Sequence, residues 1–286
     1  MGSPALARFA PLLFVLLWST GFIGAKLGLP HAEPLTFLLI RYLLVLALMT
    51  PLALAMRAPW PRDARHWFHI GVSGLLVHGI YLGGVYVAIG KGLPAGVTSL
   101  VVGIQPLLTA IGAGWLLKET VLARQWLGLL LGFVGVGMVV SGKLGAGFGL
   151  DALWPALAAL AGITVGTLYQ KRFCGAFDWR TGSIAQFLPT ALLTWLVAAL
   201  TEDFRVAWTG EFIFAMTWLV LVLSIGAISL LNWLIRRGSA VNIASLFYLV
   251  PPCTALMAWA LFDERLAGMA LAGMALAVWG VYLARK

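Results

Sequence analysis

Apolar residues run in long, uninterrupted stretches along the whole chain, and polar residues collect in short segments between them. Each stretch of about twenty residues is long enough for a helix to cross a hydrocarbon core about 30 Å thick. Only helices or closed barrels satisfy the backbone in lipid, and the alternation of a barrel strand is absent, so the pattern predicts helices. Ten spans are predicted, at about 9–29, 34–56, 67–89, 94–117, 122–141, 150–170, 181–200, 212–235, 240–262 and 266–284.

One passage of the chain occurs twice. Adding 145 to the residue number maps Pro106 onto Pro251 and Gly128 onto Gly273, and no gap is needed between them. The same offset maps the first five predicted spans onto the last five. Because five is odd, the two halves insert with opposite orientation, which is the inverted repeat typical of secondary transporters. We therefore expect two five-helix halves, residues 1–145 and 146–286.

Composition agrees with an all-α integral membrane protein. Hydrophobic residues make up 62% of the chain and charged residues 10%, whereas a soluble domain is about 25% charged. The net charge of +9 would suggest nucleic acid in a soluble protein, but here the positive-inside rule explains it, so no nucleic-acid partner is expected.

The distribution of the cations over the loops predicts the orientation. Thirteen Lys and Arg residues lie on the side of the two termini and five on the other. The excess places both termini in the cytoplasm, and we expect a multi-pass protein of the cell's inner membrane.

Pro106 and Pro251 lie near the middle of their spans, where proline removes a helical hydrogen bond. Equivalent breaks in the two halves are the best sequence indication of a transporter site, although a tolerated kink is the alternative. Small residues beside both prolines, and the glycines of the fifth and tenth spans, are expected to pack helices closely.

Arg41 is expected about 10 Å inside the second span, and the offset of 145 maps it onto Gln186. It could bind a substrate carboxylate or act as a gate, or it could snorkel to the outer interface toward Glu33. His78 is the one group in the middle of a span that titrates near neutrality, with Tyr81 on the same helical face. The alternative is a histidine that is hydrogen-bonded to a neighbouring helix.

Other polar and aromatic residues inside the spans could line an apolar cavity with a few hydrogen-bonding groups. They are Trp18, Ser19, Thr20, Gln105, Thr164, Tyr169, Gln186, Asn232 and Tyr248. No Asp or Glu lies in the middle of a span. Catalytic motifs, metal-ligand clusters and a Walker motif are absent from the sequence, so we expect neither an enzyme nor a cofactor.

The chain resembles an EamA-type member of the drug/metabolite transporter superfamily. The resemblance rests on LLWSTGFIGAK in the first span, on Arg41, on the Pro106-to-Glu119 passage with WLGLLLGFVGVG after it, and on the second copy from Pro251. Asp263 stands before Glu264 where Lys118 precedes Glu119, so the two copies are not identical. The resemblance implies a ten-helix carrier with a central cavity and leaves the substrate open.

The sequence therefore predicts a monomeric exporter of small organic metabolites, either amino-acid-like or aromatic and amphiphilic. It would work by alternating access, through a cavity between spans one, three, four, six, eight and nine. A passive channel and an intramembrane enzyme are the alternatives. The coupling ion and the direction of transport stay open.

Overall fold

A computed structural model of the chain describes residues 4–93, 95–141, 150–262 and 267–285. Apart from one isolated antiparallel bridge between Ala32 and Val206, the regular structure of these residues is helical. Ten helical stretches are long and apolar enough to cross a membrane. The predicted all-helical, ten-span fold is thus confirmed.

The first half contains five spans. They comprise α1 (Pro4–Gly28) with the 3₁₀ turn η1 (Leu29–His31); α2 (Pro34–Ala55); α3 (Ala64–Gly74), the π-helical η2 (Leu75–Leu82) and α4 (Gly83–Gly90); α5 (Ala95–Val102) and α6 (Gln105–Leu116); and α7 (Ala123–Val140).

The second half repeats this order. Its spans comprise the turn η4 (Leu150–Ala152) and α8 (Leu153–Phe173); α9 (Trp179–Thr201); α10 (Gly210–Trp218), the π-helical η5 (Leu219–Ala227) and α11 (Ile228–Arg237); α12 (Ala240–Ser245), the 3₁₀ segment η6 (Leu246–Leu249) and α13 (Val250–Phe262); and α14 (Gly268–Arg285).

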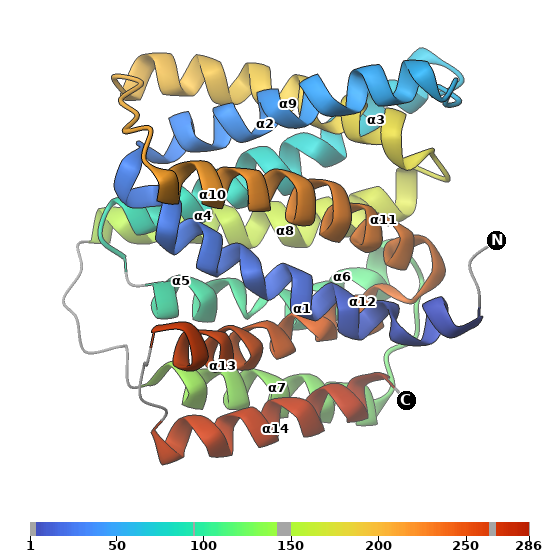
Figure 1. Cartoon of the computed structure of the whole chain (residues 1–286). Coiled ribbons are helices and arrows are strands. Elements are labelled where there is room, and N and C mark those ends of the chain that lie inside the picture. The colour runs from blue at the N-terminus through green and yellow to red at the C-terminus, as the bar shows by residue number, and fades with distance from the viewer. Residues whose placement is uncertain (1–3, 94, 142–149, 263–266, 286) are drawn as a thin grey trace.

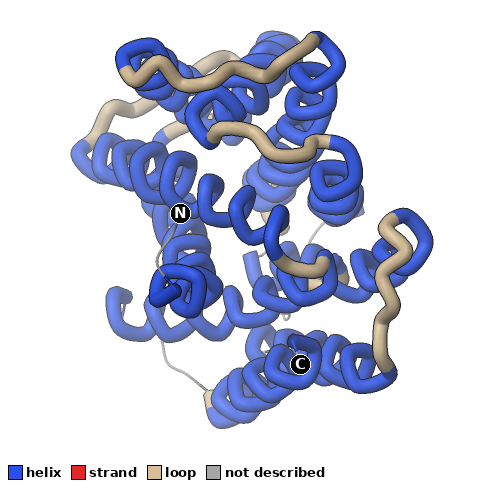
Figure 2. The backbone as a smooth tube through the Cα atoms, turned by 90° about the vertical axis from the view of Figure 1, so that its right-hand side faces the viewer, coloured by secondary structure: helices blue, strands red, loops and turns tan. Residues whose placement is uncertain are grey.

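Successive spans run in opposite directions through the bundle, so α1 begins at the same end at which α14 finishes (Figures 1 and 2). We call this the terminal end, and the opposite one the distal end. Figure 1 also shows α1 and α8, the first spans of the two halves, running in opposite directions. This is the geometry expected of an inverted repeat with an odd number of spans.

Glycines bring α7 and α14 into backbone contact at one edge of the bundle (Figure 1). A Cβ on Gly280 would lie 2.4 Å from the backbone nitrogen of Gly132, and one on Gly135 would lie 2.5 Å from that of Ala277. The expected close packing of spans five and ten is therefore confirmed. For Gly268 the expectation is wrong, because a Cβ there would meet nothing within 4 Å.

At the opposite edge of the bundle, α2 and α9 lie side by side (Figure 1) and are tied at both ends. At the distal end, the Glu202 carboxylate accepts hydrogen bonds from the backbone of Leu35 and Thr36 and from the Thr36 hydroxyl, each 2.7 Å. A carboxylate is favourable there because it meets the free N–H groups at the start of α2. At the terminal end, the Thr181 hydroxyl donates to the Pro59 carbonyl at 2.7 Å. Thr36 and Thr181 are 145 residues apart, so the repeat is preserved in these contacts.

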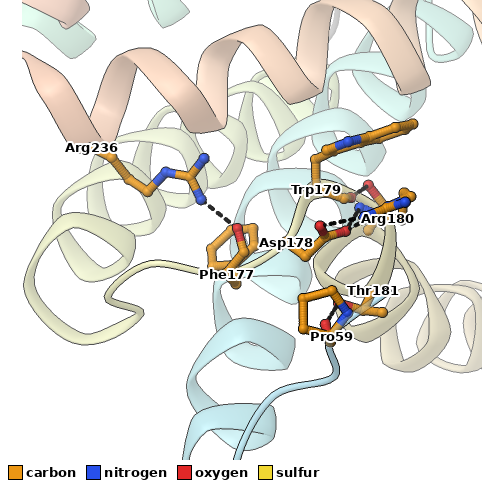
Figure 3. Close-up of polar contacts among 8 residues, drawn as sticks. Pro59, Phe177, Asp178, Trp179, Arg180, Thr181 and Arg236 are labelled. Carbon is orange, nitrogen blue, oxygen red and sulfur yellow. Dashed lines mark hydrogen bonds and ion pairs between the residues drawn. The ribbon is translucent and has the colours of Figure 1, made fainter. Parts of the chain in front are cut away.

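Figure 3 shows how the loop before α9 is held. The Asp178 carboxylate accepts hydrogen bonds from the backbone nitrogen, Nε and Nη2 of Arg180, at 2.8–2.9 Å. Arg236, from the end of α11, donates to the Phe177 carbonyl at 2.6 Å and lies over the Phe177 ring. These contacts attach the loop to spans seven and eight at the terminal end.

Candidate functional site

Both predicted helix breaks are present, and each one directly precedes its proline. α5 ends at Val102 and α6 begins at Gln105, one residue before Pro106. In the second half the 3₁₀ segment η6 ends at Leu249, two residues before Pro251. Proline has no N–H to donate to the carbonyl four residues before it, and its ring crowds that carbonyl. Those carbonyls belong to Val102, where α5 ends, and to Phe247 in η6, so both breaks follow from the sequence.

A cavity of about 40 Å³ lies beside the two breaks. Its walls come from spans one, three, four, five and nine, so both halves contribute to it. Thr98 and Ser99 lie near the start of α5, which places the cavity in the distal half of the bundle. The lining residues are Trp18, Phe22, Tyr81, Val85, Thr98, Ser99, Val102, Gly103, Val136, Phe247, Val250 and Pro251.

The volume of this cavity determines what it can hold in this conformation. One water molecule needs about 10–15 Å³, so 40 Å³ admits a few waters. Pockets for small organic ligands measure about 300–1,000 Å³. Helices must therefore separate before a solute can enter this cavity.

The bundle is tighter at the terminal end. The cavity at this end, beside Gln105, Lys171 and Ala240, measures only about 10 Å³, against about 40 Å³ for the cavity in the distal half. Glu119 pairs with Lys171 at 3.1 Å and accepts a hydrogen bond from the backbone nitrogen of Ala240, the first residue of α12. Glu119 belongs to the first half and its partners to the second, so the halves are joined at this end. The equivalent Glu264 lies outside the described residues.

Arg41 is buried in α2, with 1% of its surface exposed. Its Nε donates to the Ser224 hydroxyl of η5 at 2.8 Å, while Nη1 has no hydrogen-bond partner among the described residues. The expectation that Arg41 snorkels toward Glu33 is wrong. Glu33 instead accepts hydrogen bonds from the backbone nitrogens of Asp203 and Arg205.

His78 lies in η2 and is also 1% exposed. Neither ring nitrogen has a hydrogen-bond partner among the described residues, and the ring stacks on Phe187 of α9 with centroids 4.4 Å apart. The Gln186 side chain of α9 lies within interaction range of the ring, but the two do not form a hydrogen bond of good geometry. His78 accepts one through its backbone carbonyl, from the Tyr42 hydroxyl at 2.8 Å. Its ring lies within electrostatic range of Arg41.

A pair of π-helical segments positions these residues. η2 occupies 75–82 in the third span and η5 occupies 219–227 in the eighth, at equivalent places in the two halves. π-Helical turns are rare and frequently occur at functional sites. They place His78 and Ser224 near Arg41. Neither segment was predicted from the sequence, nor was Ser224, because no composition signal marks a π turn in a uniformly apolar run.

A chain of hydrogen-bonded polar side chains, buried in the bundle, links four helices. Gln170 of α8 donates to Asn232 at 2.8 Å, Asn232 donates to Gln186 at 3.4 Å, and Gln186 donates to Ser73 at 3.1 Å. These side chains satisfy one another, so they hold spans three, six, seven and eight in register. Gln186 and Asn232 were predicted to line the cavity and do not border it.

The remaining predicted site residues are divided between the cavity, the helix contacts and the two ends. Trp18, Tyr81 and Pro251 line the cavity. Ser19 bonds the Val15 carbonyl within its own helix. Thr20 accepts from Trp218 at 2.9 Å, and Tyr169 meets His69 at 2.6 Å toward the terminal end. The Thr164 hydroxyl donates to the Leu160 carbonyl within α8. The Gln105 side-chain amide donates to the Thr109 hydroxyl within α6. The Tyr248 hydroxyl is buried and has no hydrogen-bond partner among the described residues. Pro106 is buried and does not border the cavity.

These features define a multi-pass membrane protein of two homologous halves, with broken helices and buried polar groups where the halves meet. The EamA-like transporter family matches residues 6–141 and again residues 152–285. The chain therefore belongs to this family.

Similar proteins agree over nearly the whole length. The Bacillus subtilis (strain 168) protein named "Uncharacterized transporter YvbV" is 27% identical over 271 residues, covering 94% of this chain and 88% of its own. The Salmonella typhimurium (strain LT2) protein named "Probable amino-acid metabolite efflux pump" is 25% identical, covering 96% and 93%. One crystal structure of a protein shares the fold, with a TM-score of 0.79, 23% identity and 99% and 97% of the two chains covered. The chain is therefore a transporter and not an enzyme.

Proposed function

We propose that the protein exports small organic metabolites, amino-acid-like or aromatic and amphiphilic, by alternating access between its two halves. The proline breaks of spans four and nine, which meet beside one cavity lined by both halves, carry this proposal. A relative named as an amino-acid metabolite efflux pump supports the direction and the substrate class.

The two moving units are residues 1–145 and 146–286, within a monomer of the inner membrane whose termini are cytoplasmic. The excess of cations at the terminal end supports this orientation. In this orientation the cavity of about 40 Å³ lies on the outer side of the breaks, and the Glu119–Lys171 contact closes the cytoplasmic side.

The proposed solute path runs past Trp18, Tyr81 and Pro251 and reaches Arg41 and His78 when the halves separate. Arg41→Ala is expected to lower the flux while the protein still folds. Normal transport by this variant would exclude a role for Arg41.

Counterflow in proteoliposomes tests the function. A panel of labelled aromatic and aliphatic amino acids and their derivatives is presented with and without a pH gradient. A carrier shows acceleration by unlabelled solute on the opposite side, whereas a channel shows none. A channel is also hard to reconcile with a cavity that holds only a few waters.

A further inference from the structure

Arg41 carries a charge that the described structure does not neutralise. The ion pairs among the described residues do not include it, and the groups that its guanidinium meets, the Ser224 and Tyr86 hydroxyls, are uncharged. The sequence holds ten Asp and Glu residues, and each of the eight that the structure describes lies in a loop or in the first turn of a helix at a span end. A buried charge without a counter-charge is strongly unfavourable, and more so at membrane depth.

The missing partner must be an acceptor that carries negative charge. Among the described residues, Arg41 Nη1 has no acceptor and neither ring nitrogen of His78 has a hydrogen-bond partner. The His78 ring lies within electrostatic range of Arg41. A carboxylate has two oxygens that accept such charge-assisted hydrogen bonds, and guanidinium is its best match among side chains. Phe187, stacked on His78, adds an aromatic wall.

Among the described residues, the same site holds no anionic side chain that could pair with an ammonium group. An amino acid at neutral pH carries both a carboxylate and an ammonium, and burying the ammonium needs an anionic partner. Because no Asp or Glu lies in the middle of a span, that partner is absent from the chain itself. An acid whose nitrogen is acylated, or which has none, avoids this penalty.

We propose that Arg41, with His78, binds the carboxylate of an aromatic or apolar organic monoanion and disfavours zwitterionic amino acids. This inference rests on the proposed function and narrows its substrate class. Access is from the cavity, because Tyr81 lines the cavity, lies in η2 three residues after His78, and is within electrostatic range of Arg41. Movement of this π-helical segment would expose the guanidinium to a solute.

Four compounds that share the phenylalanine side chain and differ in net charge test this selectivity. They are N-acetyl-L-phenylalanine, a monoanion; L-phenylalanine, a zwitterion; N-acetyl-L-phenylalanine methyl ester, which is neutral; and L-phenylalanine methyl ester, a cation. Each is added at millimolar concentration to the purified full-length protein, and its affinity is measured from the rise in Tm. We expect the monoanion to bind about tenfold more tightly than the others, which is the effect of one additional charge-assisted hydrogen bond.

Arg41→Gln should abolish this preference, and Arg41→Lys should keep part of it. Glutamine is the residue that the second half carries at the equivalent position 186, so the substitution has a precedent in this fold. Lys91→Gln is the control, because Lys91 is an exposed cation paired with Asp151. This variant should bind as the parent does.

Equal binding of monoanion and zwitterion, an undiminished preference in Arg41→Gln, or no binding of any of the four overturns the inference. Counterflow measured with the same compounds distinguishes a failure of this inference from a failure of the proposed function. Exchange of acid and zwitterion at equal rates supports the carrier and contradicts the selectivity. Binding of the acid by the parent protein without exchange supports the site and contradicts the carrier.

Discussion

At the scale of the residue, the contact between Arg41 and Ser224 joins the two halves near the centre of the bundle. Ser224→Ala should lower the stability by about 1–3 kcal/mol, because it leaves the buried Nε of Arg41 without an acceptor. In a protein that also carries Arg41→Gln, Ser224→Ala should lower the stability by a smaller amount. The coupling between the two sites, about 0.5–3 kcal/mol for residues in contact, is measured by unfolding all four proteins in detergent. Additive effects would show that the hydrogen bond does not form.

Asp178 gives a prediction that depends on pH. The hydrogen bond from the Arg180 side chain is the largest of the effects that hold the pKa of the Asp178 carboxyl below its usual range. Such a carboxyl stabilises the fold above its unfolded-state pKa, about 3.9, and the stabilisation is lost as the pH falls through the folded-state pKa. Asp178→Asn should therefore lower Tm at pH 7 by a few degrees, and the difference should disappear in acid, once the pH has fallen through the lowered folded-state pKa.

Asp151→Asn is the matched control for this measurement. The Asp151 carboxylate is exposed and lies 3.5 Å from Lys91, so its removal should leave Tm unchanged at both pH values. If the Tm difference between Asp178→Asn and the parent persisted in acid, it would result from the shape of the side chain and not from its charge.

Cys174 shows how local burial decides reactivity at this scale. It follows the last residue of α8 and is 1% exposed, and burial raises the pKa of its thiol to about 11. The thiolate is the reactive form of cysteine. The thiolate fraction of Cys174 is therefore small near neutral pH, and this cysteine should react slowly there.

At the scale of the element, α7 and α14 depend on glycine because their backbones touch. Gly280→Ala should destabilise the protein by about 1–3 kcal/mol, the usual cost of overpacking, since its Cβ would meet the backbone of Gly132 at 2.4 Å. Gly268→Ala lies on the same helix in open space and should not lower Tm. Thermal unfolding of the two variants checks this, and equal losses would contradict the proposed backbone contact.

The helix breaks were predictable and the π-helices were not. Proline changes the backbone wherever it occurs, so Pro106 and Pro251 reveal the breaks directly. η2 and η5 contain no proline and read LLVHGIYL and LVLVLSIGA. The wider π-helical turn leaves no mark in the amino-acid composition of these segments, so only the backbone of the folded structure reveals it.

At the scale of the whole molecule, alternating access requires the two halves to separate at the distal end. There Ala32 of the first half pairs with Val206 of the second in an antiparallel bridge, and Ala207 donates to the His31 carbonyl at 2.7 Å. Residues opposite each other in such a pair have Cα atoms about 4.5–5.5 Å apart, which a disulfide can bridge.

Ala32→Cys with Val206→Cys, in a protein whose two native cysteines are replaced by alanine, should form this disulfide. Oxidation is expected to stop counterflow, and reduction to restore it, because the distal end can then open again. The two single-cysteine variants are the controls and should respond to neither treatment. Full transport in the oxidised double variant would show that this end does not need to separate.

The sequence alone determined the number of spans, their inverted duplication and the two breaks. In lipid the backbone must be satisfied within each apolar stretch, so the length of a stretch and its prolines decide the element. The tertiary structure decided which polar groups meet. The partner of Arg41 lies 183 residues away, and Gln186 and Asn232, expected in the cavity, form a chain between helices instead. Such contacts depend on how each helix is rotated about its axis, and in a uniformly apolar segment packing between helices sets that rotation.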